Sequence, residues 1–314
     1  MKILVAGATG ALGKQLVPQL VTAGHEVVGM TRSVAKRDAL RALGATPVVV
    51  DALDAEQVTR AMAEVRPEAI IHQLTALSGG LDLRRFDRAF AETNRLRTAG
   101  TDHLLAAGRA VGVRRFLAQS FAGWPYARTG GPVKNEQAPL DPRSPAALRA
   151  ALDAIRHLEE AVIGAEWTEG IVLRYGGFYG PGTSLDGPGS EHVEAIRRRL
   201  FPLIGDGAGV WSFIHVADAA EATLAALERG HRGIYNIVDD KPARVADWLP
   251  ALARAVGAKP PRRVPRWLGH LLGGEVATLM MTTQRGASNA KARRELGWAP
   301  RHPSLAGVFA ERTL

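Results

Sequence analysis

The sequence predicts an α/β protein with a doubly wound parallel sheet and a smaller C-terminal lobe. Through the first half of the 314 residues, short apolar runs of strand length alternate with helix-length segments. A glycine-rich turn over 7–13 directly follows the first of these runs. After Tyr175 the alternation gives way to a stretch rich in Gly and Pro, which indicates loop. We therefore expect one domain over 1–175 and a second lobe over 176–314.

Six runs rich in Val, Ile and Leu are expected to be strands of the sheet. They are Lys2–Ala6, Glu26–Met30, Thr46–Val50, Ala69–His72, Val113–Gln119 and Gly170–Tyr175. Parallel strands are buried on both faces, so they form continuous apolar runs rather than alternating ones. Helices are expected between them, with Leu12, Leu16 and Leu20 on one face of the first, another beginning near Asp54, and a long one over Leu83–Val111.

The second lobe is expected to be mixed. Its predicted elements are a loop over Gly176–Gly189, helices over Glu191–Leu200 and Val216–Arg229, a strand over Gly233–Val238, a rigid linker over Lys259–Pro265, and helix onward to Trp298. The segments around 210–240 are expected to return to the first domain. Ligands of such sheets bind beyond the carboxyl ends of the strands, where this lobe would complete a site.

Composition excludes several classes of protein. Apolar residues make up 46% and charged residues 23%, which are globular values. No apolar run is long enough to span a bilayer, no secretory leader precedes the first strand, and cysteine is absent, so we expect a cytoplasmic enzyme with no membrane partner. His and acidic residues lack metal-binding spacing, so no metal is expected. The net charge of +9 comes from residues 241–314, and without a nucleic-acid-binding motif we interpret it as solvated surface.

The turn after the first strand has the pattern G-x-x-G-x-x-G. Gly7 permits the tight turn, Gly10 lets the backbone approach a pyrophosphate, and Gly13 lets helix and strand pack closely. The phosphates would lie on free N–H groups at the positive end of the helix dipole. The intervening residues expected to contact the dinucleotide are Thr9, Ala11 and Leu12. This context predicts a Rossmann-type dinucleotide site.

Residues after the second strand favour NADP(H) over NAD(H). NAD-binding proteins place an acidic side chain there to bind the ribose 2′-hydroxyl. Here Thr31 occupies that position, and Arg32, followed by Ser33, offers a partner for a 2′-phosphate. The alternative is that Arg32 is a solvated surface cation. Asp51, beside Ala52, is expected to accept from the adenine amino group or to act in helix capping. NAD(H) remains an alternative cofactor.

Motifs along nearly the whole chain resemble the extended short-chain dehydrogenase/reductases of the NAD(P)-dependent epimerase/dehydratase type. In order they are GATGALG, VVVDALD, AIIHQLTAL, the segment ETNRLRTAGTDHLLAAGRAVGVRRFLAQS, LRYGGFYGPG, WSFIHVADAAEA, YNIVDDKP and SNAKARRELGWAP. The resemblance implies further cofactor contacts at Leu74, Thr75, Ala76, Gln119, Gly176 and Phe178. It also makes His215 and Asp218 structural anchors, and it implies a homodimer through Leu83–Val111 and Pro145–Gly164.

The resemblance fails at the acid/base helix. The family uses a Y-x-x-x-K pair there, but this chain has Ala151 or Leu152 at the tyrosine position and Ile155 or Arg156 at the lysine position, depending on whether Glu159 or Glu160 sets the register. Aliphatic side chains transfer no proton. The resemblance implies that Ser120 polarises the reacting oxygen. Tyr126, Tyr175 and Tyr179 are candidate substitutes, with Tyr175 nearest the expected nicotinamide position, although structural packing is the favoured interpretation for each. Water and the substrate itself are the alternative proton sources.

The substrate side also departs from the family. Members acting on nucleotide-diphosphate sugars carry a phosphate-clamping arginine where this chain has Trp211, and Met281 lies where a second arginine is expected. Indole offers a single neutral N–H, so an apolar or flat ligand fits better than a diphosphate. Trp211 could equally pack the lobe interface. The residues expected to line the substrate are Ser120, Tyr126, Phe178, Trp211 and Met281.

The sequence therefore predicts an NADP(H)-binding oxidoreductase that transfers hydride to or from a small, largely apolar carbonyl or alcohol. Two alternatives stay open. A non-catalytic dinucleotide sensor or scaffold needs no Y-x-x-x-K, and it would bind cofactor without turnover. A nucleotide-sugar epimerase or dehydratase needs phosphate-clamping cations, and it would bind UDP or dTDP.

Overall fold

A seven-stranded parallel sheet forms the centre of the protein in the computed structural model, which describes residues 1–77, 83–187, 189–305, 307 and 309. Its order is β12 (Gly233–Ile237), β7 (Glu169–Tyr175), β5 (Arg115–Phe121), β4 (Ala69–His72), β1 (Lys2–Ala6), β2 (Glu26–Thr31) and β3 (Thr46–Val49). Strand order reverses between β1 and β4, where Ile3 lies opposite Val27 on one side and Ala69 on the other. The predicted doubly wound α/β class is confirmed.

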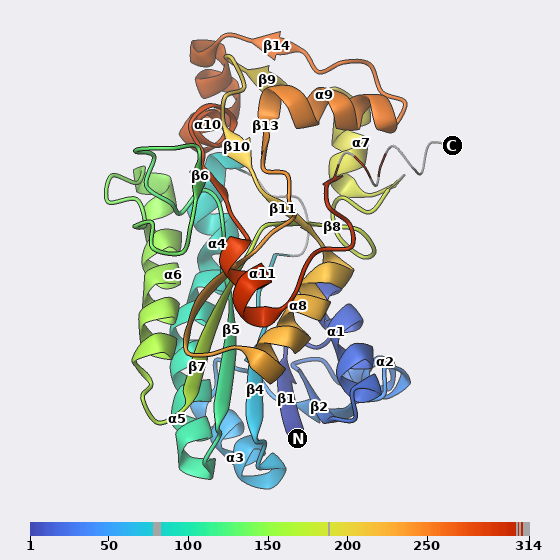
Figure 1. The fold of residues 1–314 in the computed structure, drawn as a ribbon, viewed down its shortest axis with the longest axis vertical. Coiled ribbons are helices and arrows are strands. Elements are labelled where there is room, and N and C mark those ends of the chain that lie inside the picture. Colours follow the sequence, from blue (N-terminus) through green and yellow to red (C-terminus); the bar gives the residue numbers. More distant parts are fainter. Residues whose placement is uncertain (78–82, 188, 306, 308, 310–314) are drawn as a thin grey trace.

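Helices cover both faces of this sheet (Figure 1). One face carries α1 (Ala11–Thr22), α2 (Arg37–Ala42), α8 (Val216–Arg229) and α11 (Ala290–Leu296). The other carries α3 (Ala55–Val65), α4 (Phe86–Arg95), α5 (Thr101–Val111) and α6 (Ala146–Gly164). Each face buries its own apolar core, so the strands between them are apolar on both sides.

A second group of elements lies beyond the carboxyl edge of the sheet, in the upper part of Figure 1. It contains β8 (Gly177–Tyr179), α7 (Glu191–Arg197), β9 (Leu203–Ile204), β10 (Val210–Trp211), β11 (Phe213–His215), β13 (Ala243–Arg244), α9 (Val245–Ala255), β14 (Arg263–Val264) and α10 (Arg266–Thr282). These elements share a third core around Trp248 and Leu249. The division at 175/176 stays a prediction, and positions 188, 306, 308 and 310–314 of that lobe lie outside the described residues.

Three sequence expectations differ in detail from the structure. The long helix over 83–111 is divided into 3₁₀ residues Leu83–Arg85, α4, a π-helical segment Leu96–Gly100 and α5. The expected linker contributes β14, which pairs with β9. The final helical stretch is broken at β15 (Gly286–Ala287), which pairs with β6 (Val133–Lys134). Such short bridges and π-bulges leave no periodicity that sequence patterns detect.

Candidate functional site

Glycine is required at two positions of the turn between β1 and α1. Gly7 has φ +95°, and a Cβ there would lie 2.6 Å from the carbonyl oxygen of Gln73, which follows β4. A Cβ on Gly13 would lie 2.5 Å from the backbone of Ala8. No side chain fits at either contact distance, so the glycines hold the start of α1 tightly against the ends of two adjacent strands.

Gly10 leaves the start of α1 open. It is the N-cap residue of α1 and provides no side-chain cap. The only described atom within 4 Å of a Cβ built there is the Gly7 carbonyl oxygen, at 3.3 Å. An uncapped helix start offers N–H donors and a positive dipole end to an anion. The turn therefore fits the phosphates of a dinucleotide. Of the predicted contacts between the glycines, Thr9 and Ala11 are partly accessible to solvent, whereas the Leu12 side chain is buried in the core.

Arg32, at the end of β2, is two-thirds exposed and pairs with Glu92 of α4. Thr31 is buried, and its hydroxyl accepts a hydrogen bond from the Ser33 backbone at 3.2 Å. After β3, the Asp51 carboxylate accepts from Leu53 N at 2.9 Å beside buried Ala52. These residues lie along adjacent strand ends, as their sequence positions predict, and their roles toward a cofactor stay predictions.

The segment after β4 runs close to the glycine turn. A Cβ on Gly7 would lie 3.2 Å from Leu74 N, and Ala76 N donates to the Thr93 hydroxyl at 3.0 Å, with Thr75 exposed between them. The other predicted cofactor contacts lie at the ends of β5 and β7. Gln119 is partly buried at the end of β5. Gly176 lies so close to the Ser212 carbonyl oxygen that no side chain would fit. The ring centroid of Phe178 lies 5.4 Å from that of Tyr175.

Ser120 belongs to a buried polar network. Its hydroxyl donates to Glu159 at 2.6 Å, and Glu159 forms a bidentate ion pair with Arg174. Arg174 also reaches the hydroxyl of Tyr126, which donates to Asn236. All five side chains are buried. In this arrangement the single Ser120 proton is directed at Glu159, so a role toward substrate stays a prediction.

Two of these network residues went unnoticed in the sequence. Arg174 and Asn236 are polar residues within otherwise apolar strand runs. A charged residue in a strand buried on both faces needs a partner, and this is the pattern that could have revealed them. Glu159, one of the two residues that set the predicted register of α6, has a structural role through its pairing with Arg174.

The face of α6 at which the sequence predicts aliphatic residues in place of an acid/base pair is apolar. Ala151, Leu152 and Ile155 are each at most 2% exposed and pack in one cluster. The cluster's aromatic members include Phe86, Phe90 and Trp124, with the two phenylalanine rings stacked at 4.1 Å between centroids. Arg156, the other candidate at the lysine position, instead pairs with Asp153 on the surface.

The tyrosines near this edge have raised pKa values. Burial raises the pKa of Tyr126 to about 12, and burial also raises the pKa of Tyr175. The Tyr175 hydroxyl lies 2.6 Å from that of Thr223 and accepts from Gln73. A buried phenol with two polar partners favours the packing alternative for Tyr175. Its catalytic role stays a prediction.

Trp211 packs between the third core, here called the upper core, and the aromatic cluster on α4 and α6. Its indole N–H donates to Met280 O at 2.7 Å, and its ring lies 5.2 Å from that of Trp248. Met281 is buried in the upper core. With its N–H committed to the backbone, Trp211 has no donor left for a phosphate at this position.

His215, Asp218 and His302 form one group among the described residues with spacing that could hold a metal ion. Their ligand atoms already have partners: His302 N and Nδ1 contact both Asp218 oxygens, and His215 Nδ1 accepts from Ala217 N at the start of α8. The two imidazole rings stack at 3.8 Å. These bonds favour the structural anchoring expected from the sequence.

Asp239 gives the stability of the protein a pH dependence. Burial, with Asp240 and Asp218 nearby, raises the pKa of Asp239 to about 8. Because this folded-state pKa exceeds the ordinary value of 3.8, the neutral form favours folding below about pH 4, and that contribution is lost as the pH rises toward 8. The slope is at most ~1.4 kcal/mol per pH unit. Asp239→Asn should reduce the fall in melting temperature between pH 4 and pH 8. The control, Asp38→Asn at an exposed position, should show the same fall as wild type. Parallel curves of melting temperature against pH for wild type and Asp239→Asn would contradict the assignment.

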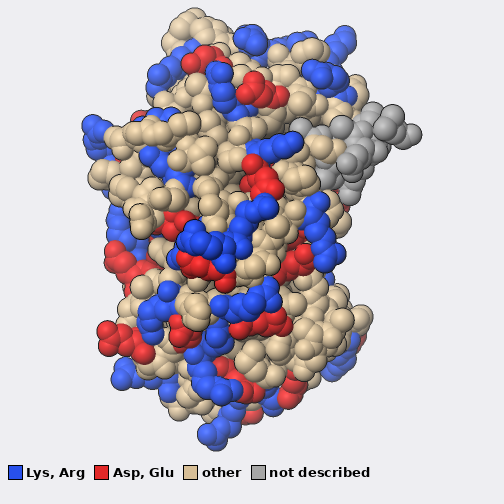
Figure 2. Space-filling model, in the orientation of Figure 1, with Lys and Arg blue, Asp and Glu red and all other residues tan. Residues whose placement is uncertain are grey.

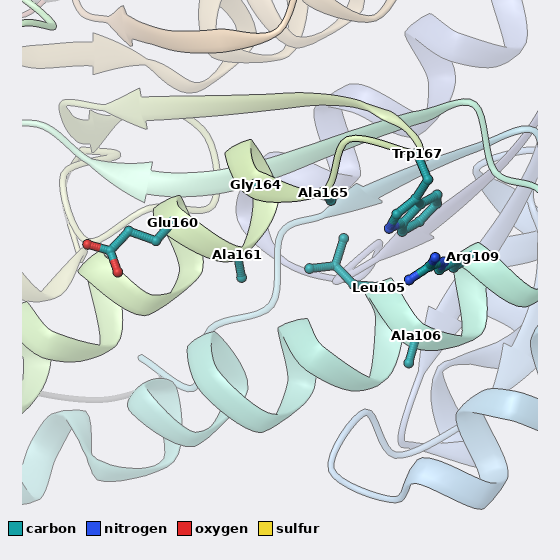
Figure 3. A pocket seen from close by; sticks show the side chains of 8 residues that line it. All are labelled: Leu105, Ala106, Arg109, Glu160, Ala161, Gly164, Ala165 and Trp167. Carbon is teal, nitrogen blue, oxygen red and sulfur yellow. The ribbon is translucent and has the colours of Figure 1, made fainter.

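A hollow of about 400 Å³ lies between α5 and α6, lined by residues such as Leu105, Arg109 and Trp167 (Figure 3). It includes the last residues of α6, which precede β7, so it lies toward the amino edge of the sheet. Ligands of open α/β sheets bind at the carboxyl edge. The hollow is therefore a surface feature of α5 and α6 and not the ligand site of the sheet. These helices belong to the segments expected to form a dimer contact, and the homodimer stays a prediction.

Some basic side chains of the C-terminal part have acidic neighbours. Arg293 pairs with Asp240, and Arg294 pairs with Glu295. Over much of the face in Figure 2, Lys and Arg side chains are interspersed with Asp and Glu. This mixed pattern agrees with a solvated surface. None of the described helices has the length and apolar character needed to cross a membrane.

Residues 3–238, from β1 through β12, match the model of the NAD dependent epimerase/dehydratase family. The chain belongs to this family. The match includes the glycine turn, the aromatic cluster on α4 and α6, and the buried network at β5 and β7. Members of the epimerase/dehydratase family share its Rossmann-type α/β fold, which this chain has.

Two curated relatives of this family member are reductases. The chain is 47% identical over 308 residues to a 3-diazoavenalumate denitrifying reductase of a Streptomyces species, covering 97% of each chain. It is 28% identical to a 4-hydroxy-2-methyl-3-oxo-4-farnesyl-3,4-dihydroquinoline-1-oxide ketoreductase of Stigmatella aurantiaca, over 99% of this chain and 96% of that one. Family and relatives together make this chain an NAD(P)-dependent oxidoreductase or epimerase-like enzyme.

Among solved structures, the UDP-glucose 4-epimerase of Thermus thermophilus in complex with NAD aligns over 100% of this chain and 98% of its own. The TM-score is 0.71 at 25% identity. The epimerase/dehydratase fold of this chain therefore has NAD-binding structural neighbours.

Proposed function

We propose that this enzyme is an NADP(H)-preferring reductase whose acceptor is a small, largely apolar aromatic compound. The observation that carries the proposal is the combination of an open glycine turn with an aliphatic face, Ala151, Leu152 and Ile155, at the acid/base positions. Residues 7–13 would hold the dinucleotide phosphates, and Arg32 its 2′-phosphate. When bound, the reduced dinucleotide supplies a hydride. The surrounding aromatic cluster orients a flat acceptor and excludes water.

A diazo group is an acceptor that suits this site. A carbonyl needs a proton donor or a positive charge for the oxygen that gains electron density. An aryl diazonium ion that accepts hydride at carbon forms a C–H bond, and its C–N bond breaks with both electrons leaving in N₂, so no side chain has to supply a proton. The 47% identical relative is named for the reductive denitrification of a diazo compound. This supports a diazo acceptor over the carbonyl or alcohol predicted from the sequence.

The proposal is tested by mixing enzyme and NADPH with an aryl diazonium salt, an aryl ketone and UDP-glucose in separate reactions. We expect NADPH oxidation with the diazonium salt above the rate without enzyme, and none with UDP-glucose. Turnover of the ketone alone would restore the carbonyl hypothesis. Cofactor binding without oxidation of NADPH by any acceptor would favour the sensor alternative.

Glu92 is expected to limit the preference for NADP(H). Its carboxylate pairs with Arg32, so a 2′-phosphate must compete for the guanidinium. Glu92→Gln should tighten NADPH binding several-fold and leave NADH binding unchanged, whereas Arg32→Ala should weaken only NADPH binding, by about tenfold. Fluorescence titration of both cofactors measures this. Equal effects on NADH and NADPH would show that Arg32 does not recognise the phosphate.

A further inference from the structure

Arg97 is a buried cation that has no hydrogen-bond or ion-pair partner among the described residues. It lies in the π-helical segment 96–100 and is 4% exposed. Its guanidinium makes no hydrogen bond or ion pair to any residue in the described ranges, and its Nη1 is fully buried and unsatisfied. Leaving a buried cation unsatisfied costs several kcal/mol. Such a group in a native structure calls for an acceptor other than the described residues of the chain.

Its surroundings place Arg97 at the proposed reaction site. The guanidinium carbon lies 6.0 Å from the Phe90 ring centroid, at the edge of the aromatic cluster that lines the aliphatic face of α6. The π-helical segment packs on α6. On that helix, Ile155 and Glu159 are one turn apart. Arg97 also acts electrostatically on His72, the last residue of β4. It therefore sits between the carboxyl end of β4 and the helix that lacks a catalytic cation.

The charge of Arg97 persists at neutral pH. Burial lowers the pKa of Arg97 to about 10, and the Glu159 carboxylate opposes that effect. Glu159 does not neutralise Arg97, because both of its oxygens are bound to Arg174. The desolvated guanidinium keeps its charge, and its buried Nη1 has no acceptor among the described residues, a combination that binds an oxyanion strongly.

We propose that Arg97 binds an oxyanion of the aromatic substrate, a phenolate or carboxylate, and so provides the positive charge that Ile155 does not. This rests on the proposed function, because it deepens the description of the same site. Arg97 would orient the ring against Phe90 and discriminate against neutral aromatic compounds. No proton transfer is required of it.

The experiment uses 4-nitrophenol and benzoate as probes, with 4-nitroanisole as the neutral control, titrated into wild type, Arg97→Met and Arg97→Lys in the presence of NADP⁺. The absorbance of 4-nitrophenol also reports whether the bound form is ionised. We expect wild type to bind at least one of the two anions about 10- to 100-fold more tightly than Arg97→Met does, with partial rescue in Arg97→Lys. Whichever anion binds identifies phenolate or carboxylate as the partner. Neither variant should change 4-nitroanisole binding.

A second readout separates ligand binding from a structural role. Because Arg97 has no hydrogen-bond or ion-pair partner in the part of the chain that the structure describes, Arg97→Met should raise the melting temperature of the protein without ligand. Loss of a structural arginine would instead lower it. Equal anion binding by wild type and Arg97→Met, or no anion binding by wild type, would overturn the inference. None of these titrations needs turnover, so Arg97-dependent anion binding without NADPH oxidation would refute the proposed function and leave this inference standing.

Discussion

Glu159→Gln is expected to lower the free energy of unfolding by about 3–5 kcal/mol, the cost of leaving a buried charge uncompensated. Glu159 is 5% exposed and Arg174 is 4% exposed. The two side chains are joined at Nε–Oε1 2.7 Å and Nη2–Oε2 2.5 Å, and Ser120 donates to the same carboxylate. The amide keeps one acceptor but loses the charge, so Arg174 stays buried without a counter-ion.

Chemical denaturation measures this, with Glu160→Gln as the matched control. Glu160 is the exposed neighbour on the same helix, and its replacement should change stability by no more than about 0.5 kcal/mol. Ser120→Ala removes one charge-assisted hydrogen bond and should cost about 1.5–3 kcal/mol. Similar stability of Glu159→Gln and Glu160→Gln would contradict the role assigned to the ion pair.

Gly10→Ala is expected to weaken NADPH binding by about 10- to 100-fold, equivalent to losing charge-assisted hydrogen bonds to phosphate. The added methyl group would lie 3.3 Å from the Gly7 carbonyl oxygen, its closest described neighbour, so that oxygen must shift by only a few tenths of an ångström. Gly10 also has φ −73°, which any residue adopts. The protein should therefore fold normally, while the methyl group blocks the approach of the pyrophosphate to the start of α1.

Gly24→Ala is the control for a general effect of replacing glycine. Gly24 has φ +82°, and no described atom lies within 4 Å of a Cβ built there. The variant should therefore lose about 1–2 kcal/mol of stability from the left-handed backbone and keep its NADPH affinity. Titration of both variants with NADPH gives the comparison. Unchanged affinity in Gly10→Ala would show that the dinucleotide does not bind at this turn.

Local patterns predicted the sheet well because each strand is short, apolar and followed by a helix. The glycine turn was equally accessible, since strand, turn and helix are contiguous in the sequence. The buried network was not, because Glu159, Arg174 and Asn236 come from three separate elements that only the fold brings together. Sequence spacing carries no information on such contacts until the strand order is known.

Arg97 shows what helical periodicity could have added. It follows Phe90 by seven residues and Thr93 by four, and it precedes Leu104 by seven, which places it on the buried face of the long helical segment. A charged residue at an inward position predicts either a partner or a ligand. Tyr175 illustrates the opposite case: its position beside the sheet edge suggested chemistry, whereas its hydroxyl lies between Thr223 and Gln73.

The central claim is that this enzyme delivers hydride to an acceptor carbon without a protein acid. It is tested most directly by NADPH deuterated at the transferred position, reacted with an aryl diazonium salt in ordinary water. The account predicts an enzyme-dependent arene with deuterium at the carbon that lost nitrogen, and N₂ released in equal amount. An arene formed at the rate seen without enzyme, or carrying no deuterium, would contradict it.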